Sequence, residues 1–112
     1  DLLVPLDTSF SQAVLSLIDE RGLTDAAVYK KANLSRQVFS KLRKDDGYRP
    51  AKPTAVALAI ALELDMDQTR ELLQRAGYAL STASTFDAIV RYYIVAINQM
   101  LFAFDQPLLG SS

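Results

Sequence analysis

The sequence contains no histidine and no cysteine, and it has only four glycines and four prolines in 112 residues. Without an imidazole or a thiolate, most acid–base and nucleophilic catalysis and the Cys/His zinc sites are excluded. A hydrolase that uses carboxylates alone is the enzyme class that remains. We therefore expect a protein that is not an enzyme and that carries no metal ion and no cofactor.

The composition describes one compact domain. Half of the residues are hydrophobic and 22% are charged, which excludes disorder and collagen-like repeats. A chain of this length buries roughly two-thirds of the surface that its unfolded form exposes, so it can build a core without disulfides or metal. Apolar residues recur every three or four positions and never alternate, so the predicted class is all-α.

No stretch is apolar enough to predict a transmembrane helix. The longest apolar stretch spans residues 86–104, and four polar or charged residues interrupt it: Asp87, Arg91, Asn98 and Gln99. The N-terminus shows no basic segment followed by an apolar one, so we expect a cytoplasmic protein and no membrane partner. The chain opens at Asp1 rather than at Met, which we interpret as a fragment, a processed product or a module of a longer protein.

The charges are segregated along the chain, although the net charge is only −1. The segment 30–52 holds eight basic residues against Asp45 and Asp46, a local charge of +6, while the rest of the chain sums to −7. This pattern predicts a positive face for a polyanion on a mildly acidic body. A solvated charged loop is the alternative interpretation.

Helix start and stop signals predict five short helices and a longer last one. The expected starts are Ser9, Thr24, Ser35, Pro53 at the first helical position, Asp65 or Asp67, and Ser84 in a capping box with Asp87. The expected stops are Gly22, Asn33 and Gly77. The helix that begins near Pro53 is apolar all round, so we expect it at the centre of the domain.

The third predicted helix is the most basic part of the chain. Its apolar residues Val38, Phe39 and Leu42 are expected to face inward. The outward positions would then hold Arg36, Gln37, Ser40, Lys41, Arg43 and Lys44.

The stretch 23–45, LTDAAVYKKANLSRQVFSKLRKD, resembles the helix-turn-helix of the lambda-repressor and Cro-like (XRE-type) family. Nine residues fall on family positions: Leu23, Thr24, Val28, Ala32, Leu34, Ser35, Phe39, Ser40 and Leu42. The stretch 53–77 looks like the fourth and fifth helices of that family. The resemblance implies a five-helix lambda-repressor-like bundle over residues 1–80, with a C-terminal helical extension over 81–112.

The resemblance also implies a site on double-stranded DNA. The third helix, about residues 35–44, would lie in the major groove. Base-reading residues carried over from the family are Arg36, Gln37, Ser40 and Lys41, side chains that match base edges. The expected phosphate contacts are Lys44, Tyr48, Arg49 and Lys52, which follow that helix.

Three positions depart from the family pattern. Tyr29 stands where the family has a small Ala at the crossing of the second and third helices, so a ring there is expected to spread the crossing. Asn33 replaces the turn glycine, a change that Asn tolerates because it adopts positive φ readily. Asp25 lies where relatives offer a neutral polar side chain to phosphate, and its carboxylate would be repelled; Asp45 and Asp46 add to this.

The stretch 84–110 resembles the tail of the branch of these domains found at the C-terminal end of larger bacterial proteins, including macro-domain proteins. Such relatives have a short extra turn near Val95 and Ala96, so we interpret the join here as a natural deletion or a gap, and we do not expect helix continuity across it. The segment is more apolar than one packed helix face requires, through Phe86, Ile89, Val90, Tyr93, Ile94, Ile97, Leu101 and Phe104. It would pack onto the first and fifth helices or form a homodimer through residues 86–104.

Three functions remain open at this point. The first is a non-catalytic, sequence-reading DNA-binding domain in transcription regulation. The second is a protein-interaction or regulatory module of a larger bacterial protein, with a fused or partner domain, whose helix-turn-helix no longer reads DNA. The third is RNA binding.

Overall fold

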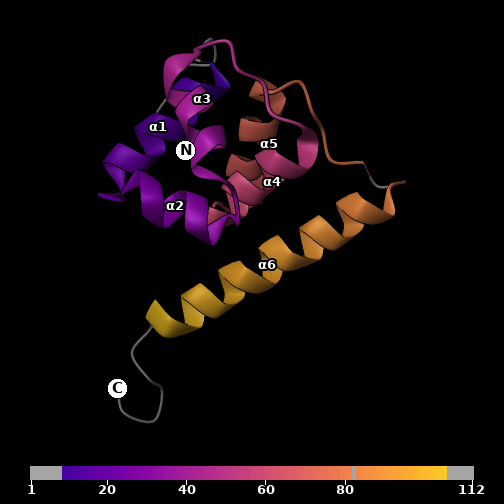
Figure 1. Ribbon diagram of the computed structural model, residues 1–112. Coiled ribbons are helices and arrows are strands. Elements are labelled where there is room, and N and C mark those ends of the chain that lie inside the picture. Colours follow the sequence, from indigo (N-terminus) through magenta and orange to yellow (C-terminus); the bar gives the residue numbers. More distant parts are fainter. Residues whose placement is uncertain (1–8, 82, 106–112) are drawn as a thin grey trace.

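A computed structural model gives the fold for residues 9–81 and 83–105, with side chains described as far as residue 100. The described residues form six helices and no strand, which confirms the all-α prediction. The helices are α1 (Phe10–Glu20), α2 (Asp25–Lys31), α3 (Arg36–Lys44), α4 (Lys52–Ala61), α5 (Met66–Arg75) and α6 (Thr85–Asp105), shown in Figure 1.

Five of the six described helices begin at a capping side chain, including α6, where Ser84 accepts from the Asp87 N–H at 3.2 Å. Ser9, Thr24 and Ser35 each accept a hydrogen bond from the backbone N–H three residues further on, at 3.1–3.2 Å. Asp65 does the same at 2.8 Å, and the Gln68 side chain closes a capping box by accepting from the Asp65 N–H. These bonds satisfy N–H groups that have no partner inside the helix, so the predicted starts are confirmed.

The ends of α1, α2, α4 and α5 share one backbone motif. In each, the residue after the C-cap has positive φ: Gly22 (67°), Asn33 (58°), Glu63 (58°) and Gly77 (85°). The next N–H then donates to the carbonyl five residues back, as in Leu23 to Ile18 at 3.0 Å. This is the Schellman arrangement, and it confirms the three predicted stops while adding a fourth at Glu63.

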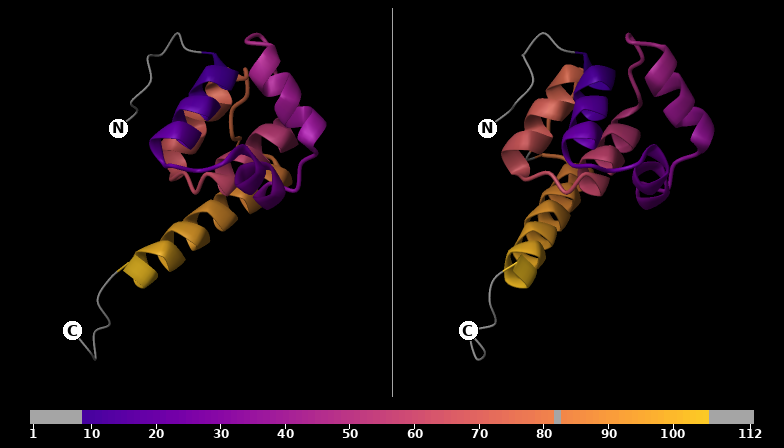
Figure 2. Two further views of the ribbon diagram at one scale, coloured as in Figure 1. Left: turned by 60° about the vertical axis from the view of Figure 1, so that its left-hand side comes forward. Right: turned by 90° about the vertical axis from the view of Figure 1, so that its left-hand side faces the viewer.

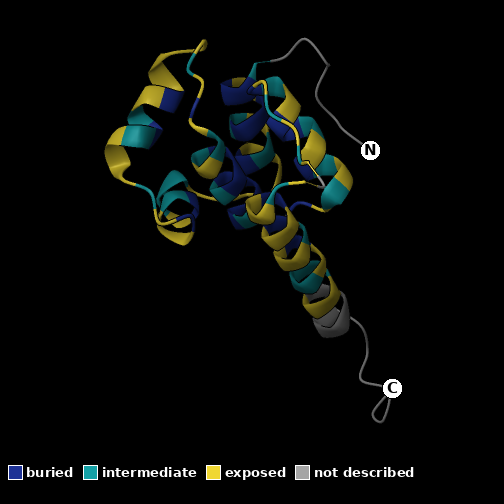
Figure 3. Ribbon diagram, turned by 90° about the vertical axis from the view of Figure 1, so that its right-hand side faces the viewer, coloured by how far each residue is buried: buried dark blue, intermediate teal, exposed yellow. Residues whose placement is uncertain are grey.

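The core lies between α4 and its neighbours. α4 packs on α2 and on α5, α1 packs on α5 and α3, and α3 packs on α2. Ala55, Leu58 and Ala59 of α4 have no exposed surface, so α4 is the buried centre that its composition predicted. Figure 3 shows the buried residues gathered at the inner faces of these helices. α4 begins one residue before Pro53, at Lys52.

α6 attaches to the bundle through α5 and then leaves it. Val90 and Ile94 are buried, whereas Phe86, Ile89 and Tyr93 are 43–54% exposed. The Asn98 side chain still donates to the Leu64 carbonyl at 3.5 Å, and only the end of α6 beyond it extends away from the other helices (Figure 2). The helix runs unbroken through Val95 and Ala96, so the expected interruption there is wrong. The predicted apolar side chains of Leu101 and Phe104 lie outside the described residues.

Candidate nucleic-acid interface

One face of α3 collects the predicted base-reading side chains. Phe39 and Leu42 are buried and Val38 is half-buried, so the opposite side of the helix points outward. Arg36, Gln37 and Lys41 are exposed there, and Ser40 is half-buried at the edge towards α2. A helical spacing of four residues brings Arg36 and Ser40, and Gln37 and Lys41, into two adjacent pairs.

The turn between α2 and α3 fixes the direction of α3. The Leu34 N–H donates to the Tyr29 carbonyl at 2.8 Å, and Asn33 supplies the positive φ that this turn requires. Ser35 then caps α3 through the Val38 N–H at 3.2 Å. The sequence signals for this turn, Asn33 and Ser35, are therefore those that set the geometry of the candidate interface.

Tyr29 is accommodated by contact with an aromatic neighbour. Its ring centroid lies 5.8 Å from that of Phe39, with the planes tilted by 49°. This separation is within the range of favourable aromatic pairs. A spread of the α2–α3 crossing relative to the family stays a prediction.

Asp25 does not stand alone at the start of α2. Its carboxylate accepts from Nε of Arg43 and, at 2.7 Å, from one Nη of the same guanidinium. The hydrogen bond from Arg43 lowers the pKa of Asp25, and the hydrogen bond to Asp25 raises the pKa of Arg43. The pair carries no net charge, so the repulsion expected from Asp25 is offset within the protein.

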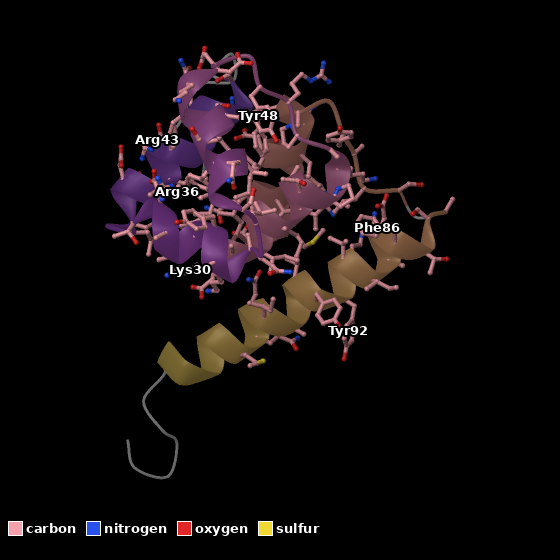
Figure 4. All side chains as sticks on the ribbon, viewed as in Figure 1. Lys30, Arg36, Arg43, Tyr48, Phe86 and Tyr92 are labelled. Atoms are coloured by element: carbon pink, nitrogen blue, oxygen red, sulfur yellow. The ribbon has the colours of Figure 1, made fainter. Side chains whose placement is uncertain are left out.

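A pocket of about 310 Å³ lies between α2 and α3 beside this ion pair. Its lining combines aromatic rings, two guanidinium groups and a hydroxyl: Asp25, Ala26, Tyr29, Arg36, Phe39, Ser40 and Arg43. Figure 4 shows Arg36 and Arg43 on the same flank of α3. The pocket therefore adjoins two of the predicted base-reading residues.

The four predicted phosphate contacts divide into two groups. Lys44 is exposed at the end of α3, and Tyr48 is half-buried in the following loop. Arg49 donates instead to the Ala76 carbonyl at 2.9 Å, and Lys52 donates to the Ala79 carbonyl at 2.8 Å. Arg49 and Lys52 thus use N–H donors within the fold, where they bond the end of α5 and the segment after it.

The acidic residues of the loop after α3 are also engaged inside the fold. Asp46 accepts from the Ser9 hydroxyl at 2.9 Å, and the Asp45 carboxylate accepts from the Gly47 N–H at 2.9 Å. On α2, Lys31 pairs with Glu63 at 2.5 Å, whereas Lys30 is exposed. The local positive charge is therefore carried most openly by α3 and Lys30.

Sequence reasoning missed the pairing of Arg43 with Asp25 and the role of Asp87. Asp87 has no exposed surface, and its carboxylate accepts from the Ser81 N–H at 2.5 Å and from Lys52 at 3.0 Å. A lone acid among apolar residues was the signal that a partner is required. The Ser84 half of the predicted capping box is present, because Ser84 accepts from the Asp87 N–H at 3.2 Å.

α6 leaves α3 open along the described part of the chain. It runs on the far side of the bundle from α3 in all the ribbon views (Figures 1 and 2). The exposed aromatic side chains Phe86 and Tyr92 lie on α6, away from Arg36 and Arg43 (Figure 4). The basic face and the apolar helix therefore form separate surfaces.

Comparison with known proteins adds no relative. No family model matches the chain, and no match was found among curated proteins or among solved structures. Within residues 9–81 and 83–105, no helix is long and apolar enough to cross a membrane. Those residues also include no group of three acidic side chains placed to hold a metal ion.

Proposed function

We propose that the chain is a non-catalytic DNA-binding domain of the lambda-repressor-like helix-turn-helix type that acts in transcription regulation. The observation that supports this most is the outward face of α3. Arg36, Lys41 and Lys44 are exposed on it, and none forms an ion pair within the described residues. Three free cations on a helix whose opposite side is anchored in the core suit a groove with negative walls.

The proposed roles follow from the chemistry of the side chains. Arg36 and Lys41 donate to the guanine acceptors N7 and O6, Gln37 pairs with adenine, and Ser40 bonds either base. Lys44 and Tyr48 contact phosphates at the end of α3, where they position the protein without reading sequence. Arg49 and Lys52 support that end of the site by fixing the α5 segment.

Pairing of two copies through α6 is part of the proposal. Phe86, Ile89, Tyr93 and Met100 share one face by their spacing of three, four and seven residues, and each is at least 43% exposed. Between Phe86 and Met100, no charged residue lies on this face, so two identical faces meet there without burying like charges. A two-fold pair would present two α3 helices to half-sites roughly 34 Å apart.

The test is fluorescence anisotropy of the full chain with a random-sequence duplex pool at several salt concentrations. A DNA-binding domain loses affinity linearly in log–log form as salt rises, because bound phosphates release counterions. Arg36→Glu and Lys41→Glu should each weaken binding by about tenfold or more. Arg70→Glu is the matched control, since it makes the same charge change at an exposed site on α5.

A second candidate function is a protein-interaction module. The exposed apolar side chains of α6 favour it, because monomeric proteins seldom leave a long apolar strip uncovered. Absence of DNA binding at low salt, with partner binding lost on substitution of Tyr93, would establish this module instead. Competition by a structured RNA that exceeds competition by duplex DNA would establish RNA binding.

A further inference from the structure

The Asp25–Arg43 pair joins the start of α2 to the end of α3. Two N–H groups of the Arg43 guanidinium, on Nε and on one Nη, donate to the two carboxylate oxygens of Asp25. This bidentate form fixes the plane of the guanidinium as well as its position. The Arg43 side chain remains 47% exposed, so the pair does not bury it.

The rest of the guanidinium is available for a second acceptor. An arginine side chain has five N–H donors, of which Asp25 takes two. The other donors of Arg43 bond nothing within the described residues. The charges of Asp25 and Arg43 cancel, but the pair stays accessible, because the Asp25 side chain is one-third exposed and the Arg43 side chain is about half exposed.

The neighbouring pocket brings further donors to the same place. Arg36 and the Ser40 hydroxyl line it together with Arg43, on the flank of α3 that faces α2. Its volume of about 310 Å³ is ample for a phosphate group. Because Arg43 neutralises Asp25, the charge of Arg36 gives the pocket lining a net charge of +1, which favours an anion.

We infer that this pocket binds one phosphate of the DNA backbone, with Arg43 as its donor and Asp25 as the positioning residue that aims Arg43. The inference rests on the proposed function, because it assigns a further contact to the same interface. It also changes the expected effect of Asp25 on DNA binding from unfavourable to favourable. An acid at the edge of a DNA site repels phosphate when alone, but here it orients a cation towards phosphate.

The direction in which Asp25→Asn changes DNA affinity tests this role. Asp25→Asn removes a negative charge, so it raises DNA affinity if Asp25 only repels phosphate. If Asp25 positions Arg43, the same substitution lowers affinity by several-fold despite the gain in net charge. In an Arg43→Gln background the Asp25→Asn change should instead raise affinity, because no guanidinium is left to position and only the repulsion is removed.

Arg43 itself is tested by the salt dependence of binding. Arg43→Gln should weaken binding by about tenfold at 0.1 M salt and reduce the slope of log affinity against log salt by about one. Arg43→Lys keeps the positive charge but lacks the planar guanidinium. It should therefore keep most of the wild-type salt slope but only part of the wild-type affinity. The control pair is Asp67→Asn and Arg70→Gln, an exposed ion pair on α5, which should leave the slope unchanged.

The outcomes separate the two proposals. Wild-type protein that binds no duplex DNA overturns the proposed function and this inference together. Wild-type protein that binds with a normal salt slope, while Arg43→Gln keeps that slope or Asp25→Asn raises affinity, overturns only this inference. Thermal unfolding of each variant shows whether the exposed substitutions leave the fold intact.

Discussion

The ammonium group of Lys52 lies 3.0 Å from Oδ2 and 2.9 Å from Oδ1 of Asp87, and this contact ties the first turn of α4 to the first turn of α6. The Asp87 side chain has no exposed surface, and Ser81 adds a backbone hydrogen bond to it at 2.5 Å. The centre of the bundle and the C-terminal helix are thus joined by a partly buried ion pair as well as by apolar packing.

Acid is expected to weaken this junction. The Ser81 N–H and then Lys52 hold the pKa of Asp87 below its usual value. A lowered pKa in the folded state stabilises the fold above the unfolded-state pKa of about 3.9, and this stabilisation is lost as the pH falls through the folded-state pKa. Asp87→Asn should therefore be less stable than wild type at pH 7, with a difference that narrows below about pH 4.

Urea denaturation from pH 7 to pH 2 measures that difference. Asp67→Asn is the control, because its side chain is 91% exposed and its loss should alter stability little at any pH. A difference between Asp87→Asn and wild type that stays constant over the whole pH range would contradict the assignment.

Two glycines at equivalent helix ends should differ in their tolerance of alanine. At Gly22 an added Cβ meets no atom within 4 Å, so Gly22→Ala costs only the left-handed backbone strain, about 1–2 kcal/mol. At Gly77 an added Cβ collides with the Arg49 guanidinium, which would have to leave the Ala76 carbonyl. Gly77→Ala should therefore destabilise more than Gly22→Ala in urea, and equal costs would sink this explanation.

The contact between Tyr29 and Phe39 should contribute measurably to stability. Tyr29→Ala removes a half-buried ring and the aromatic pair, so we expect a loss of about 2 kcal/mol. Tyr29→Phe keeps both rings and is expected to stay close to wild type. Chemical denaturation of the two variants checks this, and an unchanged midpoint for Tyr29→Ala would show that the ring is dispensable.

Self-association through α6 should depend on one face of that helix. Tyr93→Asp places a charge in the exposed apolar strip and should convert dimers to monomers in sedimentation velocity. Ala88→Asp is the matched control, because Ala88 is also exposed on α6 but lies off the strip. Wild-type protein that stays monomeric over the whole concentration range would contradict self-association through this strip.

The helix boundaries were predictable because the signals for them are local. Ser9, Thr24 and Ser35 each bond an N–H three residues away, so the chain itself places the partner within reach. The end of α4 escaped prediction because Glu63 adopts φ 58° without the glycine that usually marks this turn. The interruption expected near Val95 came from the family resemblance alone, and no Gly or Pro there breaks the helix.

The candidate site was predictable only in part, because only some of its contacts are local in the sequence. The outward side of α3 follows from the buried positions of Phe39 and Leu42 at helical spacing. The partners of Arg43 and Lys52 are 18 and 35 residues away, and no local pattern specifies which distant carboxylate each will meet. Their contacts depend on how the helices pack, which required the structure.

The self-contained helix starts also bear on the speed of folding. Caps that reach across three residues form without closing long loops, so much of the secondary structure does not wait for distant segments to meet. Helical domains dominated by such contacts fold in about microseconds to milliseconds. The nearly all-apolar α4 is therefore exposed only briefly in a newly made chain, which limits the time in which copies can aggregate through it.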